Sequence, residues 1–97
     1  MRFKDKVCLV TGAGSGIGRA TALAFGREGV KVVVTDINLE NARKTVEILR
    51  GSHSEAIAIK VDISKREDVE NMVKTAVETF GRLNCAANCA GIAGPRQ

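Results

Sequence analysis

The chain has 97 residues, of which 44% are hydrophobic and 27% charged, so its length limits it to one domain, residues 1–97. The formal net charge of +4 comes from scattered lysines and arginines, and no run of five like charges occurs, so we expect no nucleic-acid partner. The short apolar run after the N-terminus does not fit a secretory signal or a membrane span, so we expect a cytoplasmic protein with no membrane partner.

The first predicted elements are a strand and a helix separated by glycines. Residues 6–11 (KVCLVT) form a nearly continuous apolar run, typical of a strand covered on both faces. Residues 17–28 are predicted to be a helix that ends at Gly29. Its apolar residues recur at helical spacing and are expected to face the core: Ile17, Ala20, Leu23 and Ala24.

A second strand and helix follow at once. Residues 30–35 (VKVVVT) are rich in β-branched residues, which favours a buried strand. Residues 36–50 are predicted to be a helix, and Gly51 follows as its stop. The apolar side of this helix carries Leu39, Ala42, Val46 and Leu49.

The third unit is again a strand before a helix, and a fourth strand closes the series. Residues 55–61 (EAIAIKV) and 83–90 (LNCAANCA) are the predicted strands. Between them, Ser64 and Glu67 have the spacing of a capping box for a helix that Gly81 ends. The amphipathic pattern of that helix rests on Val69, Met72, Val73, Ala76, Val77 and Phe80.

This alternation predicts an α/β fold with a doubly wound, Rossmann-like parallel sheet. Short strands joined by helices imply right-handed crossovers. We expect the truncated order β-α-β-α-β-α-β with spatial strand order 3-2-1-4. The first and fourth strands would then be neighbours, with a crevice at their carboxyl ends onto which Gly12 and Gly91 open.

The glycine cluster between the first strand and helix points to a diphosphate site. The segment from Gly12 to Gly18 reads GAGSGIG, which differs from G-x-G-x-x-G because position 17 is Ile. No Lys-Ser or Lys-Thr pair follows, so a triphosphate loop is disfavoured. Backbone without side chains at a helix start lets a diphosphate approach the amides. A flexible loop is the alternative interpretation.

Asp36 follows the second strand, where a carboxylate can accept hydrogen bonds from both hydroxyls of an adenosine ribose. It would also repel a 2′-phosphate, and neither Ser15 nor Ile37 is basic, so we expect NAD in preference to NADP. Arg19, in the first turn of the helix, keeps NADP open. The alternative is that Asp36 only caps the next helix.

Two further strand ends carry candidate binding residues. Asp62 could bond an adenine amino group, with the backbone of Ile63 alongside, or it could help to cap the following helix. In the segment Asn88-Cys89-Ala90-Gly91 the small residues let a nicotinamide ribose lie close to the backbone, and Asn88 could bridge strands. Without a ligand, the same segment is an Asx turn at a strand end.

The three cysteines, Cys8, Cys85 and Cys89, all fall in predicted strands. Cys85 and Cys89 are four residues apart on one strand, about 13 Å, which is too far for a disulfide. The spacing is not C-x-x-C and His53 is the single histidine, so we expect buried free thiols and no metal site.

Together these residues resemble the short-chain dehydrogenase/reductase family along essentially the whole chain. The resemblance rests on Thr11-Gly12-x-x-x-Gly16-x-Gly18, Asp36, Asp62 and Asn88-x-Ala90-Gly91. It implies an NAD(P)-binding fold and hydride transfer between the cofactor and an alcohol or carbonyl substrate. It also implies a set of cofactor-binding residues: Gly12, Ser15, Gly16, Ile17 and Gly18 for the diphosphate, Asp36 for the ribose, Asp62 and Ile63 for adenine, and Asn88, Ala90 and Gly91 beside the nicotinamide ribose.

The sequence departs from the family pattern in two respects. The family usually has a second Asn where this chain has Cys89. Its catalytic Ser, Tyr and Lys belong to the second half of the fold, and the chain has no tyrosine, so no catalytic residue is assigned. We expect this chain alone to bind NAD weakly and to show no turnover. The alternative function is a non-catalytic nucleotide-binding or interaction module that pairs with a partner, or with itself, through the fourth strand.

Overall fold

The structure is a computed structural model that describes residues 5–88. Within this range four strands alternate with three helices: β1 (Val7–Thr11), α1 (Gly16–Arg27), β2 (Lys31–Asp36), α2 (Leu39–Gly51), β3 (Ala56–Lys60), α3 (Arg66–Phe80) and β4 (Cys85–Asn88). None of the helices in this range is long and apolar enough to cross a bilayer.

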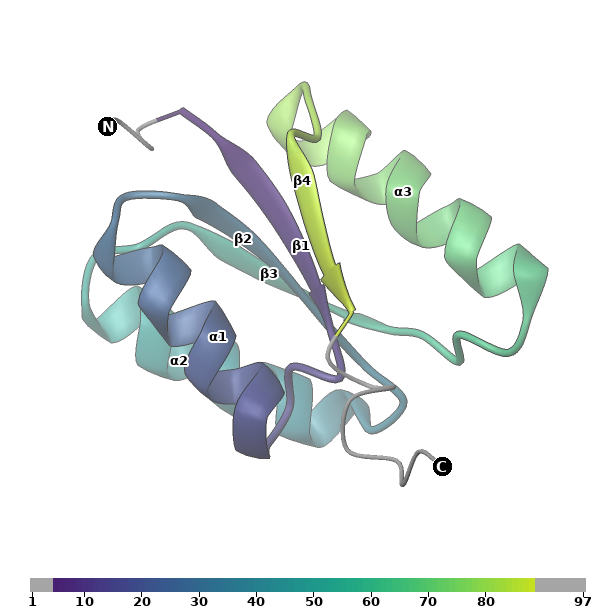
Figure 1. The fold of residues 1–97 in the computed structure, drawn as a ribbon, viewed down its shortest axis with the longest axis horizontal. Helices are drawn as coiled ribbons and strands as arrows, with labels where there is room; N and C mark the ends of the chain where they lie inside the picture. Colours follow the sequence, from purple (N-terminus) through teal and green to yellow (C-terminus); the bar gives the residue numbers. More distant parts are fainter. Residues whose placement is uncertain (1–4, 89–97) are drawn as a thin grey trace.

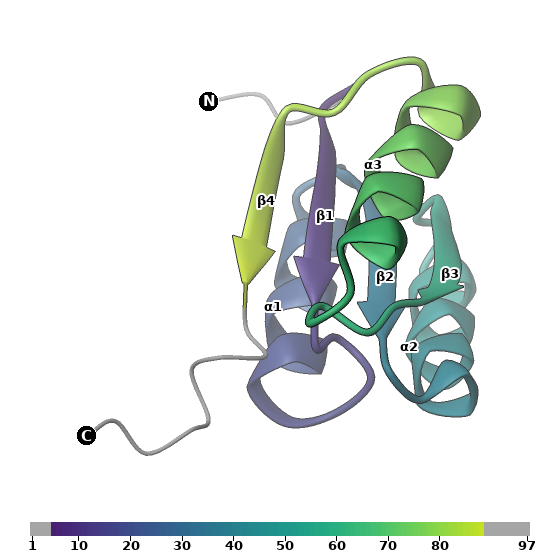
Figure 2. The same cartoon turned by 90° about the vertical axis from the view of Figure 1, so that its right-hand side faces the viewer.

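The strands form one parallel sheet in the order β3-β2-β1-β4, which confirms the predicted topology. The helices α1 and α2 lie on one face of the sheet and α3 lies on the other (Figures 1 and 2). Because all three strand pairs are parallel, the carboxyl ends of the four strands lie along one edge of the sheet. At that edge Thr11 of β1 is the register partner of Asn88 in β4.

The core lies in two layers because neighbouring residues of a strand point to opposite faces. The layer under α1 and α2 includes Val10 and Val34, whereas the layer under α3 includes Leu9 and Val33. All five residues of β1 are buried, as the continuous apolar run predicted. A strand with helices on both faces needs apolar residues at every position.

The predicted core face of α1 is correct only at Leu23, which is partly buried and packs against the core. Ile17 is 58% exposed, and the buried residues of the helix are Gly18, Ala22 and Gly26. The helix packs through small residues because its neighbours approach its backbone closely. A Cβ atom at Gly26 would overlap the Leu49 side chain of α2. Hydropathy alone favours large apolar residues, so the sequence pattern missed the small residues that face the core.

The predicted capping box before α3 is also wrong. The N-cap residue is Lys65, and its side chain makes no capping hydrogen bond. The Ser64 hydroxyl instead donates to Asp62 Oδ1 over 2.6 Å, and the Ser64 amide donates to the same oxygen over 3.0 Å. In a capping box the serine oxygen accepts from a backbone amide of the helix, whereas here Ser64 donates to a charged carboxylate in the turn that precedes the helix. The helix ends at Gly81, as predicted.

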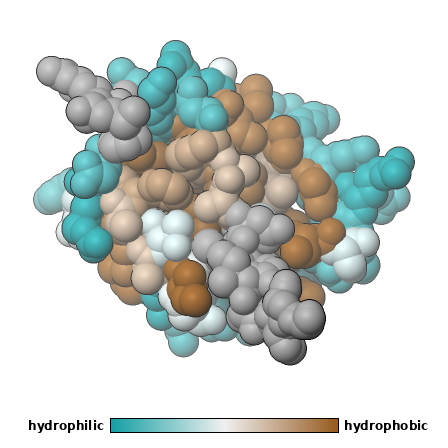
Figure 3. All heavy atoms as spheres, in the orientation of Figure 1, coloured by the Kyte–Doolittle hydropathy of each residue, from teal (hydrophilic) through white to brown (hydrophobic). Residues whose placement is uncertain are grey.

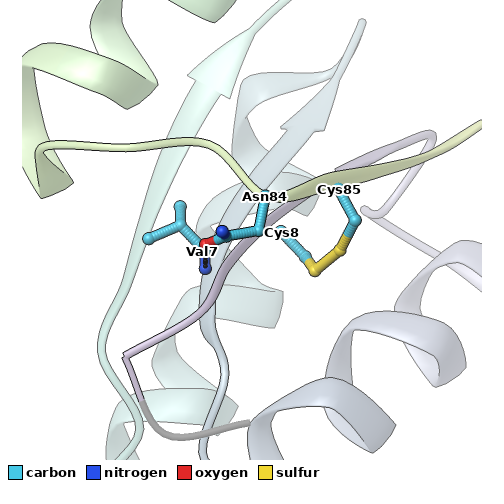
Figure 4. Close-up of a disulfide and its surroundings, with 4 residues drawn as sticks. All are labelled: Val7, Cys8, Asn84 and Cys85. Carbon is cyan, nitrogen blue, oxygen red and sulfur yellow. Dashed lines mark hydrogen bonds between the residues drawn. A yellow bond between two sulfur atoms is a disulfide. The ribbon is translucent and has the colours of Figure 1, made fainter.

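Cys8 and Cys85 form a disulfide, which corrects the prediction of free thiols (Figure 4). They are register partners on β1 and β4, with their Cα atoms 4.7 Å apart. Beside them, Asn84 accepts a hydrogen bond from the Val7 amide through its side chain, and its own amide donates to the Val7 carbonyl oxygen. The prediction compared only cysteines of one strand, whereas a parallel register brings distant cysteines together. Cys89 lies outside the described residues.

β4 is at the edge of the described sheet, beside β1 alone. Cys85 and Ala86 on this strand are exposed. Apolar residues gather on the face that β4 presents in Figure 3. On α3, Val73 and Val77 are 40% and 42% exposed, although the amphipathic pattern placed them on the core side. The strand therefore offers an open edge next to apolar surface.

Candidate functional site

A pocket of about 420 Å³ opens at the carboxyl ends of β1, β2 and β3, beside the N-terminus of α1. It is lined by eight of the predicted binding residues: Gly12, Ser15, Gly16, Ile17, Gly18, Asp36, Asp62 and Ile63. The pocket also includes three residues that the sequence did not predict as binding residues: Thr35, Ile37 and Val61. Asn88 ends β4 opposite Thr11, whereas Ala90 and Gly91 lie outside the described residues.

The N-terminus of α1 supplies hydrogen-bond donors to this pocket. The first amides of a helix have no acceptor within it, and the helix dipole makes this end positive. Ser15 is the N-cap residue, but its side chain makes no capping hydrogen bond. The first turn contains no acidic residue. This end of α1 therefore suits an anionic group.

The glycines allow the chain to turn and pack closely before α1. Gly12 and Gly16 have φ values of 64° and 57°, a region that other residues rarely adopt. A Cβ atom at Gly18 would overlap the carbonyl group of Gly12. The glycines thus form a tight turn that packs against the start of α1.

Backbone hydrogen bonds fix the loop from the β2 side. The Ala13 amide donates to the Thr35 carbonyl oxygen over 2.8 Å. The Gly14 amide donates to Asp36 Oδ2, also over 2.8 Å. A Cβ atom on Gly14 would lie 2.7 Å from the same oxygen. The loop and the carboxylate at the end of β2 are therefore packed directly against each other.

Asp36 is a half-buried residue that lines the pocket and does not cap α2. The cap is Asn38, whose side chain accepts from the Asn41 amide over 3.0 Å. Asp36 Oδ1 accepts from the Asn38 amide over 2.9 Å. Each carboxylate oxygen thus has one protein donor, which fixes its direction, and each keeps lone-pair capacity for a ligand hydroxyl.

Arg19 is the basic residue that left NADP open, and its guanidinium is engaged within the protein. Its Nε donates to Thr45 Oγ1 over 2.8 Å, and its Nη2 donates to the Gly14 carbonyl oxygen over 2.6 Å. These bonds hold the side chain between the loop and α2. Sequence spacing alone could not show this, because Thr45 follows 26 residues later in the chain.

Asp62, which follows β3, also lines the pocket. Hydrogen bonds from the Ser64 hydroxyl and amide, with a smaller contribution from the charge of Lys65, hold the pKa of Asp62 below its usual value. The Asp62 amide donates to Asp68 Oδ2 over 3.0 Å, which ties this turn to α3. Asp62 therefore organises the turn before the helix, although it is not the cap.

Large apolar side chains stand exposed around the pocket. Ile17, Ile37 and Ile63 have exposed fractions of 58%, 62% and 44%. Such residues are usually covered, and here they come from the first turn of α1 and from the segments that follow β2 and β3. They offer flat apolar contacts to a ring system beside the polar groups of Asp36 and Asp62. In the sequence, the position of Ile37 directly after Asp36 is the feature that could have identified it as a residue of the pocket.

Comparisons with known proteins agree on one family. A model described as short chain dehydrogenase matches residues 6–97. Cyclohexanol dehydrogenase of Acinetobacter sp. (strain SE19) is 50% identical over 93 residues, which cover 96% of this chain and 37% of that enzyme. The chain thus spans a little over a third of this relative's length.

Solved structures show the same likeness in three dimensions. A hydroxysteroid dehydrogenase from Escherichia coli has a TM-score of 0.88 and 31% identity, over 90% of this chain and 37% of that one. A short chain dehydrogenase/reductase from Burkholderia phymatum, solved in complex with NAD, has a TM-score of 0.85 and 35% identity. That match covers 89% of this chain and 31% of the other.

Proposed function

Because the chain belongs to the short chain dehydrogenase family, we propose that it forms the nicotinamide-dinucleotide-binding part of an oxidoreductase. The protein would transfer hydride between the cofactor and an alcohol or carbonyl compound. One observation carries the proposal: the free donor end of α1 and the carboxylate of Asp36 face one pocket. A dinucleotide presents a diphosphate and a ribose diol, which need these two groups together.

The residues present fit such a cofactor. A Cβ atom at Gly16 would meet nothing within 4 Å, so the backbone at the start of α1 faces open space in the pocket, where a diphosphate could approach it. Asp36 would accept hydrogen bonds from the ribose hydroxyls, and Ile37 and Ile63 would flank the adenine ring. Asp62 would meet its amino group. When bound, the cofactor supplies a carbon that accepts or releases hydride. The residues described here bind and orient it, and we assign no catalytic residue among them.

We propose NAD in preference to NADP. A 2′-phosphate would lie close to the Asp36 carboxylate, and the repulsion between these two negative charges would cost electrostatic energy. Arg19 does not offset this repulsion, since its guanidinium is bound to Thr45 and Gly14. The NAD found with the Burkholderia phymatum structure supports a dinucleotide of this type. A cytoplasmic location remains a prediction from the sequence.

Calorimetric titration with NAD and with NADP tests the proposal. We expect this chain to bind NAD more tightly, and Asp36→Ala to weaken NAD by about tenfold, since a charge-assisted hydrogen bond contributes about 1.5–3 kcal/mol. NADP should bind Asp36→Ala more tightly than wild type, because the repulsion of its 2′-phosphate is removed. Glu47→Ala, on the exposed face of α2, is the control for loss of an acidic residue. Equal binding of both cofactors, unchanged by Asp36→Ala, would contradict the preference. No binding of either would contradict the function.

A second candidate is a non-catalytic nucleotide-binding module that pairs through β4. The exposed edge of this strand and the apolar surface beside it favour pairing (Figure 3). Unpaired strand edges are templates for another strand. Sedimentation of the chain with and without NAD separates the two ideas. A stable dimer that binds NAD favours the module, whereas a monomer that binds NAD favours the binding part of an enzyme.

A further inference from the structure

We propose that Arg19 and Thr45 are positioning residues that hold the glycine loop in the shape needed to receive a diphosphate. The inference rests on the proposed function, because the two residues support the loop of the same site without lining its pocket. Neither residue lines the pocket. They would act on the ligand only through the backbone of Ala13 and Gly14.

We call Thr45 and Arg19 together the clamp, and Thr45 is its buried residue. It lies on α2, is 0% exposed, and its hydroxyl donates to the Ala13 carbonyl oxygen over 2.8 Å. The same hydroxyl accepts from Arg19 Nε over 2.8 Å. A buried hydroxyl that lost these partners would leave polar groups unsatisfied. One side chain of α2 therefore joins the loop to the first turn of α1.

Arg19 is the second residue of the clamp. Its Nη2 donates to the Gly14 carbonyl oxygen over 2.6 Å, with a longer contact of 3.4 Å to the Asn41 carbonyl oxygen. Within residues 5–88, its hydrogen-bond partners are the Thr45 hydroxyl and two carbonyl oxygens, none of which carries a formal charge. A cation in the first turn of a helix is unfavourable there, because that end is already positive. A diphosphate bound at this end would attract both the guanidinium and the positive end of the helix, which would offset this cost.

The clamp completes the restraint of the loop. From β2, Thr35 and Asp36 hold the amides of Ala13 and Gly14. From α2 and α1, the clamp holds the two carbonyl groups of the same residues. All four backbone groups therefore have fixed partners. A preorganised loop binds its ligand without first losing conformational freedom, which strengthens binding.

The test substitutes Thr45→Val, which removes the hydroxyl and keeps the shape of the side chain. Binding of NAD, ADP and adenosine to the full chain is measured by NMR titration. We expect NAD and ADP to bind about tenfold more weakly, the effect of about 1.4 kcal/mol. Adenosine lacks a phosphate group, so its affinity should stay within about twofold. Thr45→Ser should restore the affinities of wild type.

Ser54→Ala is the matched control, because the Ser54 hydroxyl also joins α1 to the chain beyond α2, through the Gly26 carbonyl oxygen at 3.2 Å. It lies at the other end of both helices and should change stability without changing the ratio of ADP to adenosine affinity. If Thr45→Val weakens all three ligands equally, or none, the clamp is overturned.

Backbone ¹⁵N relaxation of the ligand-free chain separates this inference from the proposed function. We expect increased motion of the Ala13 and Gly14 amides in Thr45→Val, and none in Ser54→Ala. If wild type binds none of the three ligands, the proposed function fails whatever the relaxation shows. If wild type binds them and Thr45→Val leaves either the loop motion or the ADP affinity unchanged, the inference alone fails.

Discussion

At the scale of single residues, the site depends on side chains that bind backbone groups close in space. Asp36 receives amides from the glycine loop and from Asn38. Asp62 receives the amide and hydroxyl of Ser64. Both carboxylates are therefore oriented before any ligand arrives. This differs from surface acidic residues, which sample many rotamers and lose that freedom on binding.

The hydrogen bonds to Asp62 have a pH signature. Because its pKa is lowered in the folded chain, Asp62 adds stability above the unfolded-state pKa, and this is lost as the pH falls through the folded-state pKa. Ser64→Ala removes the largest cause of the shift, so we expect the pKa of Asp62 to rise toward its usual value. Carbon-13 NMR titration of the carboxyl groups measures it. Ser52→Ala, after α2, is the control, and an unchanged pKa in Ser64→Ala would contradict the assignment.

At the scale of elements, the contact between α1 and α2 explains the small residues of α1. Gly26 lies against Leu49, and Gly18 lies against the loop. The two helices can approach closely only where one of them lacks a side chain. Arg19 and Ser54 then add hydrogen bonds near the two ends of this contact. The helix pair therefore behaves as one layer that supports the loop.

Gly26→Ala tests this packing. The added methyl group would overlap Leu49 and lie 3.0 Å from Ser54 Oγ, so we expect the free energy of unfolding to fall by about 1–3 kcal/mol. Gly51→Ala is the matched control, since a Cβ atom at that helix end meets nothing within 4 Å. Replacing that glycine should be neutral or stabilising by up to about 1 kcal/mol. Urea unfolding of both variants measures the difference, and equal stability would rule out the close contact.

Local patterns predicted the element order well, because buried strands and amphipathic helices leave regular periods in the sequence. The strand order 3-2-1-4 is confirmed. The start of α3 was mispredicted for a local reason, because the capping pattern of Ser64 and Glu67 did not take account of the hydrogen bonds from Ser64 to Asp62. The small-residue packing of α1 could not be predicted, since it depends on Leu49, which meets this helix only after folding. The same holds for Thr45: nothing in the sequence near the glycines indicates that a residue of α2 completes their hydrogen bonds.

At the scale of the whole molecule, the disulfide joins the first strand to the last described one. Cys8 and Cys85 are 77 residues apart in sequence, so the bond closes most of the chain into a loop. The largest effect of such a bond is on the unfolded state, whose freedom it reduces. It also holds β4 to β1, where the strand has no neighbour on its other side within the described sheet.

Reduction of this disulfide should destabilise the chain. With a loop of this length we expect the free energy of unfolding to fall by about 2–4 kcal/mol in dithiothreitol. The number of thiols titrated in denaturant should rise by two. In the double variant Cys8→Ser and Cys85→Ser, dithiothreitol should leave the urea midpoint unchanged. The same thiol count before and after reduction of wild type would show that the bond does not form.

The covalent link between β1 and β4 also determines how the chain responds to proteolysis. Cleavage of one peptide bond in any surface turn between Cys8 and Cys85 leaves both pieces attached through sulfur. The nicked molecule keeps the mass of the intact chain plus one water. Mass spectrometry without reductant would therefore report an almost unchanged species, and two peptides would separate once a reductant is added.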